Sequence, residues 1–274
     1  MKRLATLVIC AVLTGAFILL TGCDKLKARD QLNKGVRSYK SAQFSAAAQH
    51  FKEAVRLDPT LLTARLFLAT TYQTQFVPNN PSPDNLRLGQ QAIRAYSSIL
   101  KRQPDNANAV AGIASIYFGM GKMKQAEKYY NRQIQIAPNN PDPYYTIGVI
   151  DWNASYKPRI AAREGFGITN PTKPFITPGT PRKVIQACKK LAAQNLPKVQ
   201  QGLQMMHKAL EINPQYVNAM TYMNLLYRED ADLTCGNAKQ SKVYLAKANH
   251  WFNRSLAVSK AVAAAKAKAA ASAQ

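Results

Sequence analysis

The feature that most constrains this chain is a spaced pattern of four residues that occurs four times. A small residue is followed, at steps of four, three and five positions, by a large residue, a third residue and a proline. The four copies are Ala47/Phe51/Ala54/Pro59, Ala92/Tyr96/Ile99/Pro104, Ala126/Tyr130/Gln133/Pro138 and Gly202/Met206/Ala209/Pro214. Such a recurrence is typical of a helical solenoid, in which each pair of helices buries its apolar face only by packing on its neighbours.

The spacing of the four prolines locates insertions. The middle interval is the shortest, and the intervals before and after it are both longer, the last by more than a whole repeat. The separation of Ala69 from Ala92, and that of Gly148 from Gly202, exceed the corresponding separation in the regular repeats by the same two amounts. We therefore expect the extra residues to lie between the two helices of repeats two and four. A fifth, less regular unit opens at Met223 and resumes near Ala246 to Phe252.

Over residues 28–258 the pattern resembles that of the tetratricopeptide-repeat (TPR) family, whose repeat length of about 34 residues matches the middle proline interval. The resemblance implies an all-α solenoid of about five helical hairpins, with insertions between the helices of repeats two, four and five. Elementary packing agrees, because Ala or Gly lets helices approach closely and proline ends the second helix. The chain departs from the family at Ser38 and Asp151, where a large residue is usual and where Tyr39 and Trp152 follow one position later.

Two insertions and the C-terminal end differ in composition from the repeats. The segment 153–199 contains five prolines before residue 182, which predicts an ordered loop packed on the solenoid edge, with a short helix over 185–195 before Pro197. The segment 75–85 predicts a stiff surface loop. Residues 259–274 are rich in Ala and Lys, which predicts a fraying helix or a disordered tail.

The N-terminus indicates export. Lys2-Arg3, an apolar stretch from Leu4 to Leu20 and the tetrapeptide ending at Cys23 predict a secretory signal peptide over 1–22. The tetrapeptide Leu-Thr-Gly-Cys resembles the lipobox of bacterial lipoproteins. The resemblance implies that Cys23 becomes the acylated, palmitate-type anchor, that 23–27 form a linker, and that the domain faces the periplasm or extracytoplasmic side of the cell envelope. The alternative is an uncleaved membrane anchor, which usually needs about 20 apolar residues.

The net charge of the chain is strongly positive, at +23. Residues 153–199 carry nine Lys or Arg residues against Glu164 alone. This excess indicates either a patch that contacts polyanions or anionic lipid, or a solvated loop whose charge aids solubility. Because the chain carries an export signal, we expect envelope polymers or lipid headgroups, and not nucleic acid, as anionic partners.

Side chains typical of catalysis are sparse. The three histidines, His50, His207 and His250, belong to different repeats and form no metal-binding pair, and no phosphate-binding loop or nucleophile motif occurs. Glu229, Asp230 and Asp232 cluster beside Arg228, which favours a surface ion-pair patch. We therefore expect no enzyme activity, no cofactor and no metal site.

Five residues occupy equivalent positions on the first helices of the repeats. In the family that position faces the concave surface, so the resemblance implies a partner-binding stripe of Tyr39, Gln73, Phe118, Trp152 and Arg228. Alternatively, Tyr39 and Trp152 rotate inward to replace the missing core aromatics. The main hypothesis is a lipid-anchored scaffold that binds an envelope protein or peptide, in an assembly, secretion or pilus-type role. The alternative is an envelope protein that binds polyanions or anionic membranes.

The cysteines predict one disulfide. Removal of Cys10 with the signal peptide and acylation of Cys23 leave only Cys188 and Cys235, in a compartment that permits oxidation. Both lie in insertions of adjacent repeats, and such insertions emerge on the same edge of a solenoid. Two unpaired thiols remain the alternative.

Overall fold

The computed structural model of the chain describes residues 23–170 and 174–272, so the predicted signal peptide lies outside the described residues. Within these ranges every regular element is a helix, which confirms the predicted all-α class. The helices divide into two compact units, at the junction between Ile136 and Ala137.

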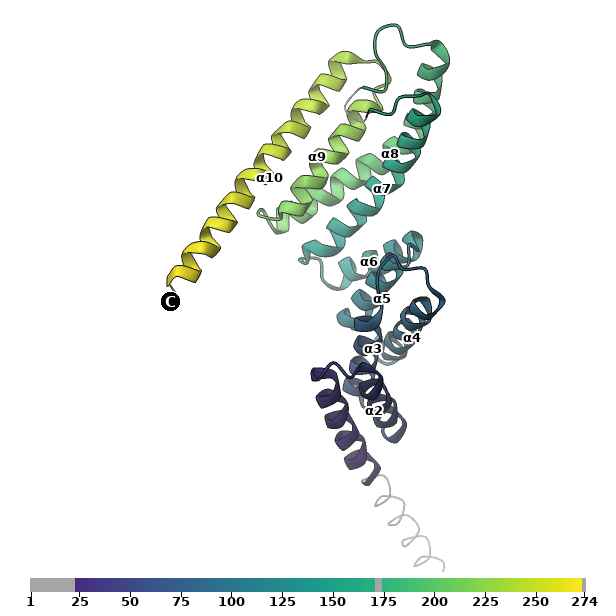
Figure 1. Cartoon of the computed structure of the whole chain (residues 1–274), viewed down its shortest axis with the longest axis vertical. Coiled ribbons are helices and arrows are strands. Elements are labelled where there is room, and N and C mark those ends of the chain that lie inside the picture. The colour runs from purple at the N-terminus through teal and green to yellow at the C-terminus, as the bar shows by residue number, and fades with distance from the viewer. Residues whose placement is uncertain (1–22, 171–173, 273–274) are drawn as a thin grey trace, which may run out of the picture. The chain divides into compact units, whose positions relative to one another are not determined.

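The first unit consists of consecutive helices joined by short turns (Figure 1). A helix over 23–40 is followed by α2 (Phe44–Leu57), α3 (Leu62–Gln75), α4 (Pro83–Leu100), α5 (Ala107–Gly119) and α6 (Met123–Ile136). From α2 to α6, each helix contacts its neighbour along the chain: α2 contacts α3, α3 contacts α4, α4 contacts α5 and α5 contacts α6. This succession of neighbouring hairpins is the arrangement that the repeat pattern predicts.

The repeated residues form the core of this unit. Ala47, Ala92 and Ala126 are fully buried, and Tyr96 is buried between α3 and α5. A Cβ added at Gly112 of α5 would lie 2.4 Å from the Tyr96 ring, so α4 and α5 approach closely only because position 112 has no side chain. The small and large positions therefore have the packing roles that the sequence pattern predicts.

The insertion of repeat two is a surface loop, as predicted, but it is anchored at both ends. Phe76 is buried at its start, and Asn85, in the first turn of α4, is buried at its end. The Asn85 amide accepts a hydrogen bond from Val77 N at 2.7 Å and donates to Val77 O and Asn80 O at 2.8 and 2.7 Å. One side chain thus satisfies three backbone groups of the loop.

Among the described residues, the second unit contains four helices, and α7, α8 and α10 are longer than any helix of the first unit (Figure 1). They are α7 (Pro141–Gly165), α8 (Arg182–Ile212), α9 (Val217–Asp232) and α10 (Ala238–Ser272). α9 packs against α7, α8 and α10, and α7 packs along α8. Every residue of the predicted tail that the structure describes, 259–272, continues α10 as helix.

The insertion of repeat four mainly lengthens its two helices, so the predicted loop over 153–199 is wrong for both of its ends. Pro158 lies inside α7, and a single α8 passes through Pro197 in place of the predicted short helix over 185–195. Asn195 Nδ2 donates to Ser155 O at 2.9 Å, which supplies a buried carbonyl one turn before Pro158 with a donor. This contact joins α7 to α8 close to both prolines.

Candidate functional site

A buried ion-pair network connects α7 to α9. Arg159 donates through Nε and Nη2 to the two carboxylate oxygens of Glu229, at 2.8 and 2.7 Å. Arg159 Nη1 also donates to Asp232 Oδ2 at 2.7 Å, and Arg163 Nη1 donates to the same oxygen at 3.2 Å. Burial raises the pKa of Glu229, and the Arg159 guanidinium opposes that rise. Each charge in the network has an opposite charge as its partner.

The predicted surface patch around Arg228 is therefore wrong. Glu229 and Asp230 are buried, and their partners are Arg159 and Gln200 from other helices. The sequence analysis assigned the acids to Arg228 because it is adjacent in the chain. The true partner of Glu229, Arg159 of α7, lies 70 residues away in the sequence. Two of the nine basic residues of segment 153–199, Arg159 and Arg163, belong to this buried network.

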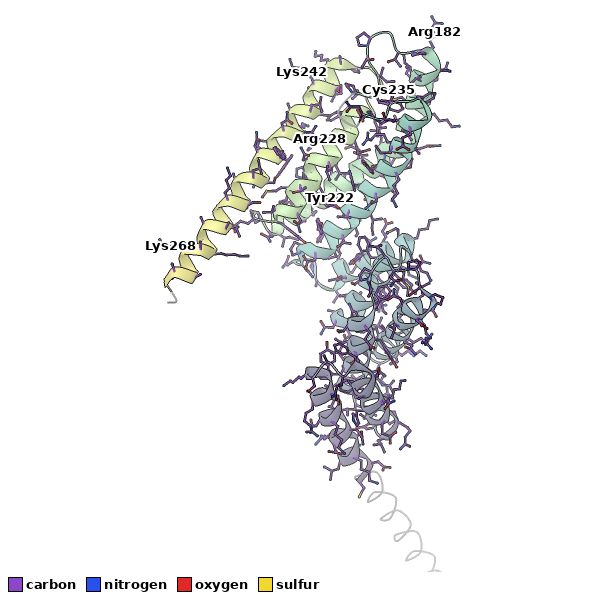
Figure 2. The ribbon with its side chains drawn as sticks, in the orientation of Figure 1. Arg182, Tyr222, Arg228, Cys235, Lys242 and Lys268 are labelled. Carbon is purple, nitrogen blue, oxygen red and sulfur yellow. A yellow bond between two sulfur atoms is a disulfide. The ribbon has the colours of Figure 1, made fainter. Side chains whose placement is uncertain are left out.

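The same network contacts two residues between α7 and α8. Arg163 Nη2 donates to Asn170 O at 2.7 Å, and its guanidinium lies 5.9 Å from the centre of the buried Phe175 ring. A disulfide joins Cys188 of α8 to Cys235, which lies before α10, with their Cα atoms 5.6 Å apart. This is the pair that the sequence analysis predicts, and Figure 2 marks the position of Cys235. Charge and packing thus hold Asn170 and Phe175, and the disulfide joins α8 to the segment between α9 and α10.

A pocket of about 350 Å³ opens beside this network. Trp152 and Tyr156 of α7, Leu225 and Arg228 of α9 and Leu245 of α10 are among the residues that line it. The Trp152 ring stacks on Tyr156, with centroids 4.7 Å apart, and meets the edge of another ring, that of Tyr222. The structure therefore brings two predicted stripe residues, Trp152 and Arg228, to one pocket.

Arg228 is exposed, and polar neighbours hold its guanidinium in place (Figure 2). Its Nε donates to Asn224 Oδ1 and its Nη2 donates to Asn249 Oδ1, both at 3.3 Å. Asn224 itself is buried and donates to Ala248 O of α10 at 2.7 Å. The cationic group is thus positioned by α9 and α10 together.

The three other stripe residues lie in the first unit, each half-buried. Tyr39 Oη is 2.9 Å from Thr74 Oγ1, and Phe118 meets the edge of the Tyr130 ring at 6.5 Å. Gln73 accepts a hydrogen bond from Tyr96 Oη at 2.6 Å and lines an open pocket of about 400 Å³ between α3 and α5. Each of these three residues thus contacts a neighbouring side chain of its own unit. Of the three, Gln73 lines the pocket between α3 and α5, and Tyr39 and Phe118 do not.

Cys23 is exposed, at the start of the helix over 23–40, and takes no part in the disulfide. Among the helices that the structure describes, none is long and apolar enough to cross a membrane. In the same residues no group of three or more His, Cys, Asp or Glu side chains is arranged to hold a metal ion.

Comparison with known proteins identifies the repeats. The family model described as tetratricopeptide repeat matches residues 89–147, which span most of α4, α5, α6 and the start of α7. The chain therefore contains tetratricopeptide repeats. The fold as a whole is similar to that of two solved structures of MamA. One, titled a crystal structure of MamA protein, has a TM-score of 0.55 at 15% identity, covering 85% of this chain and 92% of the other.

The second MamA structure, residues 41 to the end of the protein from Desulfovibrio magneticus RS-1, has a TM-score of 0.55 at 14% identity. It covers 86% of this chain and 96% of the other. At such identities the likeness shows that the folds agree.

Two curated relatives match parts of this TPR protein. The "Protein CTR9 homolog" of Arabidopsis thaliana is 24% identical over 194 residues, which is 67% of this chain and 16% of the relative. "Tetratricopeptide repeat protein 8" of Caenorhabditis elegans is 29% identical over 59 residues, which is 22% of this chain and 12% of the relative. The chain thus spans less than a fifth of either relative.

Proposed function

We propose that this TPR protein is a lipid-anchored scaffold that binds a protein or peptide partner in the bacterial cell envelope. A TPR fold by itself suggests a protein-interaction scaffold. The observation that carries the proposal is the pocket shared by Trp152 and Arg228, because the two residues occupy equivalent positions on the first helices of successive repeats.

The pocket has the chemistry of an anchor site for a side chain. The stacked rings of Trp152 and Tyr156 offer a flat apolar wall, and Leu225 and Leu245 add aliphatic surface. Aromatic and arginine side chains are the residue types that most often dominate the energy of protein interfaces. Arg228 presents N–H groups that would donate hydrogen bonds to a carboxylate or a backbone carbonyl of the partner. A peptide with an apolar anchor next to an acceptor group fits this arrangement.

Partner capture from crosslinked membranes tests the binding site. Arg228→Ala and Trp152→Ala should each lower the amount of co-purified partner by about tenfold, the loss expected when a hot-spot residue is truncated. Lys208→Ala is a matched control, because Lys208 is exposed in the same unit and lies outside the pocket. Circular dichroism verifies folding. Unchanged capture by both folded pocket variants would show that the partner binds elsewhere.

The anchor is tested separately at Cys23. Two or more acyl chains hold a protein on a membrane far more firmly than one chain does. Cys23→Ala should therefore move the protein from the membrane fraction to the supernatant or leave a longer precursor. Mass spectrometry of the wild-type chain should find acylated Cys23 as its first residue. An unmodified Cys23 in membrane-bound protein would refute the anchor.

Binding to a polyanion or to anionic lipid is the second candidate function. It is supported by four basic residues that are exposed at the beginning of α8: Arg182, Lys183, Lys189 and Lys190. Salt separates the two candidates, because screening weakens contacts between exposed charges much more than apolar contacts. Partner capture that persists at high salt favours the pocket. Capture that is lost at high salt, and is also lost in the double variant Lys189→Ala with Lys190→Ala, favours the basic patch.

A further inference from the structure

The last helix exposes an apolar stripe. Leu245, Phe252 and Leu256 of α10 are 36%, 49% and 45% exposed, and their spacing of seven and four positions places them on one face of the helix. The neighbouring face, with Ala248 and Ser255, is buried. Large apolar side chains exposed in a row indicate an interaction surface more often than single ones do.

The stripe borders a corner between α10 and α9. Leu245 lines the 350 Å³ pocket together with Leu225 and Arg228 of α9. One turn further along α10, Asn249 accepts a hydrogen bond from Arg228 of α9. A helix, which is a rod about 10 Å wide, can lie along the stripe and contact Leu245 and Arg228 at one end of it.

Charge decides which helix fits. Within Ala238–Ser272 there are seven Lys or Arg residues and no Asp or Glu. Lys242 and Lys260 lie on the solvent side of the stripe, about 80° around the helix from Phe252 at about 100° per residue. Arg228 adds a cation at the corner, where the nearby acids Glu229 and Asp232 are already paired with Arg159. A second copy of α10 would bring like charges together, whereas an acidic helix would neutralise them.

From this arrangement we infer that α10 docks an acidic amphipathic helix of another protein. The apolar face of that helix packs on Leu245, Phe252 and Leu256, and its carboxylates face Lys242, Lys260 and Arg228. The surface shares Leu245 and Arg228 with the Trp152 pocket and adds Phe252, Leu256, Lys242 and Lys260, which do not line that pocket.

The probe is a fluorescent synthetic helix of about five turns, with Leu at every third or fourth position and Glu at most others. Its affinity for the purified full-length chain is measured by fluorescence polarisation. Phe252→Glu and Leu256→Glu should each weaken binding at least tenfold, because they place a carboxylate where the apolar face docks. Val243→Glu is the matched control and should change affinity less than threefold. Val243 is 46% exposed and lies nine positions before Phe252, on the opposite side of α10.

Charge and site are tested with the same assay. A peptide with Lys in place of Glu should bind at least tenfold more weakly than the acidic peptide. Trp152→Ala should lower partner capture and leave the affinity for the acidic peptide within threefold, which separates this inference from the proposed function. Equal binding of the two peptides, or equal losses with Val243→Glu and Phe252→Glu, would overturn the inference.

Two further outcomes would overturn it in favour of another occupant. The first is binding to phosphatidylglycerol vesicles that Phe252→Glu abolishes, with no binding of the acidic peptide. The second is a dimer in analytical ultracentrifugation that Phe252→Glu dissociates. The substitutions are at exposed positions, and unchanged circular dichroism would verify that the variants fold.

Discussion

Arg159 and Glu229 form a two-pronged hydrogen-bonded ion pair across 70 residues of sequence, with donor–acceptor distances of 2.8 and 2.7 Å. Their side chains are 8% and 2% exposed. A buried pair of this kind contributes little net stability compared with apolar residues of similar size, but removing one partner leaves a buried charge without compensation. The pair therefore fixes how α7 and α9 meet.

Arg159→Met should lower the free energy of unfolding of the second unit by about 3–5 kcal/mol, because Glu229 then lacks its main partner. Urea unfolding can be followed by tryptophan fluorescence, since both tryptophans, Trp152 and Trp251, belong to this unit. Arg182→Met, at an exposed position, should change stability by no more than about 0.5 kcal/mol. The double variant Arg159→Met with Glu229→Leu should recover much of the loss. An Arg159→Met variant as stable as the control would contradict this account.

Replacing both Cys188 and Cys235 by Ser should destabilise the second unit by about 4 kcal/mol in the chain-entropy model for a loop closed over 47 residues. The same urea unfolding assay measures the difference. Peptide mapping of the exported protein without reductant should recover the bridged peptide. If reductant leaves the unfolding of the wild-type chain unchanged, the bond either does not form or does not stabilise the fold.

Asp230 should make the second unit less stable as the pH rises towards neutrality. Burial raises its pKa to about 6, although Gln200 donates two hydrogen bonds to its carboxylate. Between its ordinary pKa near 4 and this value the folded state binds more protons than the unfolded state, so the free energy of unfolding falls as the pH rises. Asp230→Asn should remove this part of the slope. Identical slopes for the wild type and the variant from about pH 4 to 7 would refute the shift.

Gly112→Ala should destabilise the first unit by about 1–3 kcal/mol, because the new methyl group would overlap the Tyr96 ring. Gly165→Ala is a suitable control, since an added Cβ there meets nothing within 4 Å. Thermal unfolding followed by far-ultraviolet circular dichroism compares the two. A loss no larger at Gly112 than at Gly165 would show that α4 and α5 separate easily.

The repeat pattern predicted the fold because its positions are decided by local packing. Ala92, a small residue, and Tyr96, a large one, lie on α4, and Tyr96 contacts α3 and α5, the helices before and after it in the chain. Their roles can therefore be read from spacing. The same reasoning brought Trp152 and Arg228 to equivalent positions, and in the structure they line one pocket.

The extended helices of repeat four could not be predicted in this way. Pro158 and Pro197 locally oppose helix, whereas α7 and α8 pack along each other through contacts, such as that of Asn195 with Ser155, that span 40 residues. The burial of Asp151 likewise depends on a distant residue, because Lys198 Nζ lies 3.2 Å from its carboxylate. Helix propensity depends on neighbouring residues in the chain and so does not predict such distant partners. One feature of the sequence was consistent with pairing between these segments: basic residues are in excess in 153–199, and acids cluster at 229–232.

Repeat proteins ordinarily open from their ends, because each repeat contacts only its neighbours and the terminal one has a single interface. The buried network and the disulfide change this for the last repeat, since both join it to the helices of repeat four. We therefore expect backbone amides in α9 to exchange with solvent at the same rate-limiting opening as those in the extended part of α7. Two repeats that would otherwise open in turn then behave as one cooperative block.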